Sequence, residues 1–157
     1  MDKKKVNLKI SSRQFTESLE PKGEAFEKKF NLDDSVEIFT EGTLNLSDDY
    51  AHINYEESEA TGLEGVTTDI TYKDGVLNVE HRGENSDEQL DLYLESGVVH
   101  ITRYVLPFAT IDVEVYAHSV SGDISEDGYG KIMADYNIKF DETLNRRNRL
   151  EIEVSPS

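Results

Sequence analysis

Apolar and polar residues alternate along most of residues 66–120, and this alternation constrains the fold more than any other feature of the chain. The alternating runs follow one another with short connections at residues 66–72, 76–80, 90–95, 98–104 and 111–118. A period of two places the apolar groups of a strand on one face, so these runs predict consecutive antiparallel strands with one dry side. Asp74-Gly75 is the strongest hairpin signal, because both central residues of a type I′ turn need positive φ.

Apolar and polar residues also alternate toward both ends of the chain. Val6, Leu8 and Ile10 predict a first strand, and residues 36–46 predict one long strand that bends at Gly42. Further runs lie at residues 51–55, 132–140 and 150–154, and the loop before the last run is expected to hold Arg146, Arg147 and Arg149. Residues 11–33 are less regular: Phe26 and Phe30 are four apart, which permits a short helix, but an irregular insertion or a hairpin is favoured.

These elements predict an all-β protein built as a single antiparallel up-and-down barrel of roughly eight to ten strands. A closed barrel removes the exposed edges that a meander would otherwise carry. The 157 residues fit one domain, 1–157, with the barrel over residues 35–154. A domain of this length buries roughly 68–70% of its unfolded surface, so one core suffices without metal or disulfide.

Charge and composition exclude several classes of function. The formal net charge of -17 disfavours nucleic acid and anionic membrane surfaces as partners. The chain has no Cys, so neither a disulfide framework nor a thiolate zinc site is expected. Its apolar runs fall short of the ~20 residues of a membrane-spanning helix, and we expect a cytoplasmic protein.

Several short motifs resemble one known family. They are Tyr55-Glu56-Glu57, Gly62-Leu63, Val66-Thr67-Thr68, Arg82-Gly83, residues 104–108, residues 130–140 and residues 150–154. In order and spacing, residues 35–154 resemble the YwiB-like family of uncharacterised bacterial β-barrel proteins. Ala109 stands where that family usually has Gly, and the segment 11–33 is longer than in typical members.

The resemblance implies a calycin-like, and so lipocalin-like, barrel without an established activity. Calycins include lipocalins and fatty-acid-binding proteins, which hold small apolar ligands inside the barrel. Applying that role to this chain is an analogy of fold, and fold alone does not fix function.

Five residues are candidates for ligand binding. Arg103 shares the parity of Val99 and Ile101, so a regular strand would point its guanidinium inward, where it could clamp a ligand carboxylate beside Tyr104 or Tyr55. The opposite parity, with His100, Thr102 and Tyr104 inward, would turn Arg103 out to solvent.

Two neighbouring positions complete the candidate set. His81 follows the parity of Leu77 and Val79 and is expected to point inward near a rim. Arg82 is expected at the surface and is a candidate because it matches the family motif Arg82-Gly83.

No residue set forms a catalytic signature, and we predict no catalytic residue, metal or cofactor. Residues 123–128 have the spacing that opens a calcium loop, but the twelfth position is Ala134 instead of an acid, which favours an acidic hairpin loop. The chain also lacks a nucleophile elbow and a phosphate-binding lysine motif. An enzyme is therefore disfavoured without being excluded.

Two functions remain open from the sequence. The first is a barrel that binds a small apolar or carboxylate-bearing ligand in its lumen. The alternative is a solid barrel that acts as a protein-interaction module through its acidic loops or a surface strand. The oligomeric state is left open.

Overall fold

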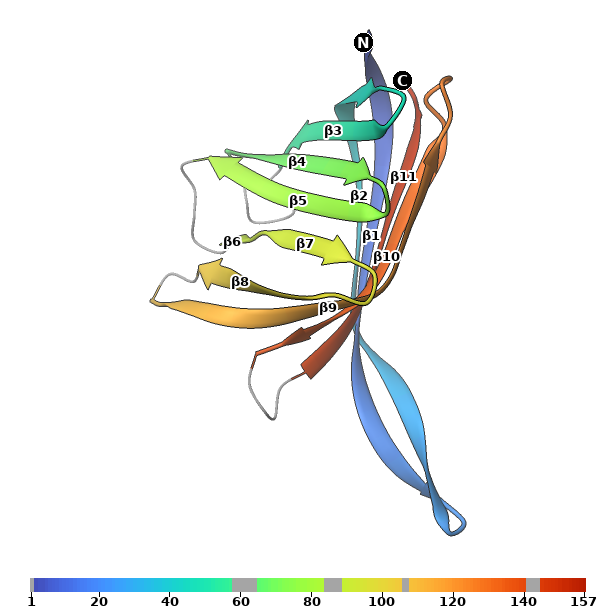
Figure 1. Cartoon of the computed structure of the whole chain (residues 1–157), viewed down its shortest axis with the longest axis vertical. Coiled ribbons are helices and arrows are strands. Elements are labelled where there is room, and N and C mark those ends of the chain that lie inside the picture. The colour runs from blue at the N-terminus through green and yellow to red at the C-terminus, as the bar shows by residue number, and fades with distance from the viewer. Residues whose placement is uncertain (1, 58–64, 84–88, 106–107, 141–144) are drawn as a thin grey trace.

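The computed structural model describes residues 2–57, 65–83, 89–105, 108–140 and 145–157, and its regular structure there consists of β-strands (Figure 1). The strands are β1 (Asp2–Lys22), β2 (Ala25–Leu46), β3 (Tyr50–Glu56), β4 (Val66–Lys73), β5 (Val76–Gly83), β6 (Gln89–Leu90), β7 (Leu92–Glu95), β8 (Val99–Val105), β9 (Thr110–Ile124), β10 (Gly130–Lys139) and β11 (Asn145–Pro156). They form one antiparallel sheet that curls into a nearly closed barrel, which confirms the predicted fold class. Within these residues, no helix is long and apolar enough to cross a membrane.

Most neighbours in the sheet are also neighbours in the sequence. The strand order is β6-β8-β9-β10-β11-β1-β2-β3-β4-β5-β7, so the last strand pairs with the first. The two ends of this order, β6 and β7, follow each other in the chain and are separated only by Asp91. Because β6 pairs with β8 while β7 pairs with β5, the segment around Asp91 joins the two edges of the sheet. The eleventh strand thus arises where one segment changes its pairing partner.

The hairpin of β1 and β2 is longer than the barrel. The two strands pair from Asp2↔Leu46 to Lys22↔Ala25, with a turn at Gly23, whose φ of 63° suits glycine. The far half of the hairpin extends away from the barrel as an arm (Figure 1). Residues 11–33, for which an irregular segment and a hairpin were both open, lie in this hairpin.

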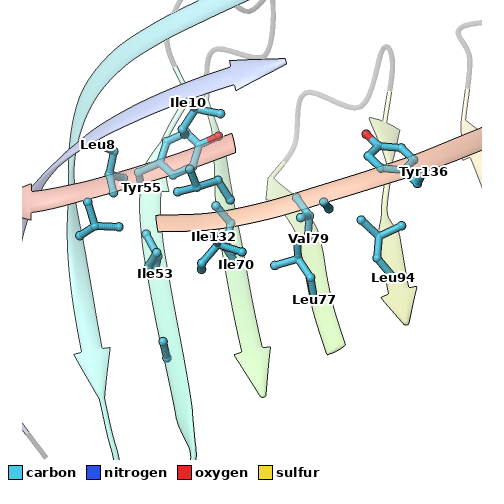
Figure 2. Packing of buried hydrophobic residues seen from close by; sticks show 14 of the residues in the cluster. Leu8, Ile10, Ile53, Tyr55, Ile70, Leu77, Val79, Leu94, Ile132 and Tyr136 are labelled. Atoms are coloured by element: carbon cyan, nitrogen blue, oxygen red, sulfur yellow. The ribbon is translucent and has the colours of Figure 1, made fainter. Parts of the chain in front are cut away.

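The middle of the barrel is filled with aliphatic side chains. The large side chains that are almost completely buried come from strands all around the sheet: Leu8, Leu44, Ile53, Ile70, Leu77, Leu94, Ile132 and Ile152. Figure 2 shows Ile132 and Tyr136 of β10 in the same cluster as Ile70, Val79 and Leu94 from β4, β5 and β7. The inward rows predicted from the alternation are confirmed at Val113, Val115 and Ile138, whereas Ile111 near the start of β9 is exposed.

Two glycine predictions can be compared with the backbone. Asp74 and Gly75 have φ of 51° and 78°, as the predicted type I′ turn requires. Gly42 lies next to Thr43, where β2 begins to pair with β3. A Cβ at Gly42 would lie 2.7 Å from the Asn54 carbonyl oxygen and 2.8 Å from Leu8 Cδ1, so the missing side chain permits this close approach.

Candidate functional site

The outer face of β9, β10, β11, β1 and β2 carries two neighbouring hollows, which together we call the groove. Along β1, Val6, Leu8 and Ile10 point into the core, and the residues between them lie on the outside. The two hollows have volumes of about 330 and 750 Å³. Both fall in the size range of small-molecule sites.

The smaller hollow, which we call the cationic pocket, lies over two rows of paired residues that run across β9, β10, β11 and β1. Its lining residues are Ser11, Arg13, Ser119, Ser121, Met133, Ala134, Asp135, Arg149, Leu150 and Glu151. Arg13 and Arg149 are directly opposite each other in the β1–β11 ladder, and Asp135 is opposite Arg149 in the β10–β11 ladder. The β9–β10 register shifts next to Asp135, and such bulges re-aim side chains locally.

Asp135 is held in a two-point ion pair with Arg147. Arg147 Nε donates to Asp135 Oδ1, and Arg147 Nη2 donates to Oδ2 at 2.9 Å, while Arg149 Nε lies 3.5 Å from Oδ2. Partial burial alone would raise the pKa of Asp135. The hydrogen bond and charge of Arg147, with the charges of Arg149 and His118, more than offset this, and the pKa lies below its ordinary value.

The second carboxylate of the cationic pocket is also neutralised. Lys131 Nζ lies 2.9 Å from Glu151 Oε1. Among the lining residues, Arg13 and Arg149 balance Asp135 and Glu151, and the cationic partners of the two carboxylates, Arg147 and Lys131, lie outside the lining. Arg149 has 59% of its side chain exposed and stacks over the Phe15 ring at 5.2 Å, which keeps its guanidinium at the surface. Because both carboxylates already have cationic partners, the guanidinium groups of Arg13 and Arg149 are placed to bind a further anion.

The larger hollow continues the groove toward an aromatic end. Its lining includes Lys9, Lys131 and Glu153, which are successive partners across the sheet. Phe39 and Tyr129 also line it and are 73% and 61% exposed. Large exposed aromatic rings in a concave surface indicate a binding site. The groove therefore has an aromatic end and a cationic end.

Arg103 is not in the groove, and of the two orientations that the sequence left open it takes the outward one. It is exposed together with Val99 and Ile101, whereas His100, Thr102 and Tyr104 are partly buried. The opposite parity therefore holds in β8, and it leaves apolar Val99 and Ile101 on the outside. Tyr104 faces inward, where its ring lies 6.0 Å from that of Phe140.

Tyr55 and His81 are brought close together on the inner face. Both are register partners of Thr68, which lies between them in the sheet. Thr68 Oγ1 donates to Glu57 Oε1 at 2.6 Å, and the Glu57 carboxylate is buried. Burial, and then the charge and hydrogen bond of Glu57, raise the pKa of Tyr55. This polar network lies within the barrel wall.

His81 also contacts the segment that joins the two edges of the sheet. Its backbone N–H donates to Asp91 Oδ1 at 2.9 Å, and its ring Nδ1 lies 3.3 Å from the same oxygen. Thr102 Oγ1 donates to the Asp91 carbonyl at 3.0 Å. Through these hydrogen bonds Asp91 links β5 and β8 at the place where the two edges of the sheet meet. His81 therefore has a structural role.

Arg82 lies on the outer face, as its parity predicts. Its Nε is 2.9 Å from Asp69 Oδ2, and His52 Nε2 and Asn54 Nδ2 lie 3.0 and 3.1 Å from Asp69 Oδ1. Asp69 is buried beneath these three partners. Arg82 therefore neutralises a buried carboxylate in this structure.

The residues of the cationic pocket were missed by the sequence analysis for two reasons. Arg147 and Arg149 were expected in a loop, which is wrong, because both belong to β11. Arg13 falls in the segment whose conformation the sequence left open. A strand assignment from residue 145 onward would have placed Arg147 and Arg149 on one face by parity.

No group of three or more His, Asp or Glu side chains suited to a metal ion occurs among the residues that the structure describes. Residues 125–128 form the turn of the β9–β10 hairpin, in which Gly128 N–H donates to the Ser125 carbonyl at 3.0 Å.

Comparison with known proteins gives a family and a fold. A search of curated proteins found no match. The structure is similar to the crystal structure of the ywiB protein from Bacillus subtilis, with a TM-score of 0.71 over 99% of this chain and 93% of that one, at 16% sequence identity. At that identity the likeness shows the fold alone. The family model described as a domain of unknown function, DUF1934, matches residues 22–152, and the chain belongs to this family.

Proposed function

We propose that this protein is a non-enzymatic binding module that holds a carboxylate-bearing ligand on the outside of its barrel. The observation that supports the proposal is the pair of facing arginines, Arg13 and Arg149, at a hollow of about 330 Å³ whose two carboxylates are already paired with Arg147 and Lys131. The ligand class is one of those that the sequence suggested, but the place differs. Aliphatic side chains fill the middle of the lumen, whereas the groove is open on the outer face.

The chemistry of the cationic pocket suits a carboxylate. Arg13 and Arg149 are cross-strand partners, so their Cα atoms lie roughly 4.5–5.5 Å apart and both guanidinium groups can reach one anion. Guanidinium groups bind carboxylates through paired, charge-assisted hydrogen bonds. The hydroxyl groups of the lining serines, Ser11, Ser119 and Ser121, are further donors.

The rest of the groove suits an apolar tail. From Arg13 to Asn7 the groove follows β1 over six residue-to-residue steps. At the rise of a strand these span about 20 Å. Met133 lies in the middle, and Phe39 and Tyr129 lie at the far end. A ligand with an anionic head and an extended apolar chain would match both ends.

Titration with sodium decanoate, followed by amide chemical shifts, tests the proposal. We expect shifts confined to the residues that line the groove on β1, β2, β9, β10 and β11 and in the β9–β10 turn. Binding should be at least tenfold weaker in Arg13→Gln and Arg149→Gln, since a hydrogen bond to a charged group contributes about 1.5–3 kcal/mol. Acetate, which has the head without the tail, should bind more weakly than decanoate.

Arg103→Gln is the matched control, because Arg103 is an exposed arginine on β8, outside the groove. It should bind decanoate as the wild type does. Equal loss of affinity in all three variants, or no shift at millimolar decanoate, would contradict the proposal.

A further inference from the structure

The arm presents a long strand edge without a neighbour. β2 pairs with β1 along its whole length, but with β3 only from Thr43 to Leu46. In the described part of the chain, residues 25–42 of β2 therefore have a strand on one side only. Such an edge is a template for pairing with another chain.

Charged side chains and a bulge usually protect a strand edge, and residues 25–42 have both, with seven charged residues, so pairing with another chain requires matching charges. Residues 25–42 contain no proline, and the exposed apolar side chains on β2 include Leu32 and Val36, which are 57% and 43% exposed. The arm extends beyond the barrel, so a second molecule can approach this edge without meeting the barrel wall (Figure 1).

The sequence of the edge is complementary to itself when read in the antiparallel direction. Residues 28–34 are Lys-Lys-Phe-Asn-Leu-Asp-Asp, with two bases, an apolar residue, Asn31, an apolar residue and two acids. Antiparallel pairing of two copies about Asn31 brings the basic pair of each copy against the acidic pair of the other. Opposite charges in cross-strand positions stabilise a sheet, whereas like charges destabilise it.

A bulge in β2 does not remove this complementarity. The β1–β2 register shifts between Gln14 and Phe15, and Asp33 is the β2 residue left without a partner there. Whether Asp33 or Asp34 takes the position opposite Lys29, a base faces an acid. A register centred on Glu37 would instead bring Glu37 opposite itself and Asp33 opposite Glu41. The charges therefore select the register about Asn31.

We propose that the arm binds a second copy of this chain, by antiparallel pairing of the two β2 edges about Asn31. This contact obeys a two-fold axis, as closed homodimers do, and it does not use the residues of the cationic pocket on β9, β10, β11 and β1. The occupant is a second copy because each chain supplies both the basic and the acidic half of the pairing.

A charge-exchange experiment tests the proposal by sedimentation equilibrium on the full chain. The wild type should show about twice the chain mass of 17.8 kDa at tens of micromolar. The double variants Lys28→Asp/Lys29→Asp and Asp33→Lys/Asp34→Lys should each be monomeric, because like charges then face each other. An equimolar mixture of the two should form a heterodimer, because opposite charges face each other again.

Lys3→Asp/Lys5→Asp is the control, since it changes the net charge as the first variant does but lies at the other end of β1. It should stay dimeric, and circular dichroism should show all variants folded. A monomeric wild type, variants that remain dimeric, or a mixture that fails to associate would each overturn the proposal.

Discussion

Gly42→Ala should destabilise the protein although the backbone at Gly42 does not have positive φ. The new Cβ would lie 2.7 Å from the Asn54 carbonyl oxygen, well inside van der Waals contact. That oxygen cannot move freely, because Asn54 pairs with Thr43 on one side and with Asp69 on the other. On the inner side the Cβ would meet Leu8, which is almost fully buried.

The size of the effect follows from two opposing contributions. Forcing an extra methyl group into a packed site costs about 1–3 kcal/mol. Reduced freedom of the unfolded chain returns roughly 0.4–1 kcal/mol when Gly becomes Ala. We therefore expect a net loss of about 1–2 kcal/mol in the free energy of unfolding, which for a domain of this length lowers Tm by roughly 2–8 °C.

Urea denaturation of Gly42→Ala beside Gly122→Ala is the appropriate assay. A Cβ at Gly122 would also be crowded, at 2.9 Å, but by the ring of Tyr72 instead of backbone. A half-buried ring can turn away, so Gly122→Ala should cost less. The reasoning fails if Gly42→Ala is as stable as the wild type, or if Gly122→Ala is the more damaging of the two.

Two further variants examine buried carboxylates. In Thr68→Val the Glu57 carboxylate loses a buried hydrogen-bond donor, so the free energy of unfolding measured by urea denaturation should fall by about 1–3 kcal/mol. An unchanged denaturation midpoint would show that this hydrogen bond does not stabilise the fold. Because its folded-state pKa is lowered, Asp135 stabilises the fold fully above about pH 4, and this contribution disappears as the pH falls through that lower pKa. The stability difference between wild type and Asp135→Asn should therefore be present at pH 6 and shrink toward zero near pH 2, and a difference independent of pH would contradict the assignment.

The strands of the barrel could be predicted because burial on one side imposes a period of two. This holds at β4 and β5, where the turn at Asp74-Gly75 also fixes the register. It fails at β8, where apolar residues occupy both parities and the sequence alone does not say which side is buried. The orientation of Arg103 stayed open for that reason.

The arm and the cationic pocket could not be predicted in the same way. The far half of the arm extends away from the barrel and buries no regular face in it, so no period marks its residues. The cationic pocket combines side chains from β9, β10, β11 and β1, which come from opposite ends of the chain. Arg13 and Arg149 become neighbours only through the pairing of the first strand with the last.

The two proposals depend on different residues of the β1–β2 hairpin, so ligand binding and dimerisation can be tested separately. The cationic pocket uses Ser11 and Arg13 near the barrel, whereas the dimer contact uses residues 28–34 of the arm. Both depend on charge, so salt should weaken both. Arg149→Gln should therefore lose decanoate and keep the dimer, while Asp33→Lys/Asp34→Lys should lose the dimer and keep decanoate. If either variant lost both decanoate binding and dimerisation, the two functions would share one surface. The assignment of ligand binding to the groove and of dimerisation to the arm would then be wrong.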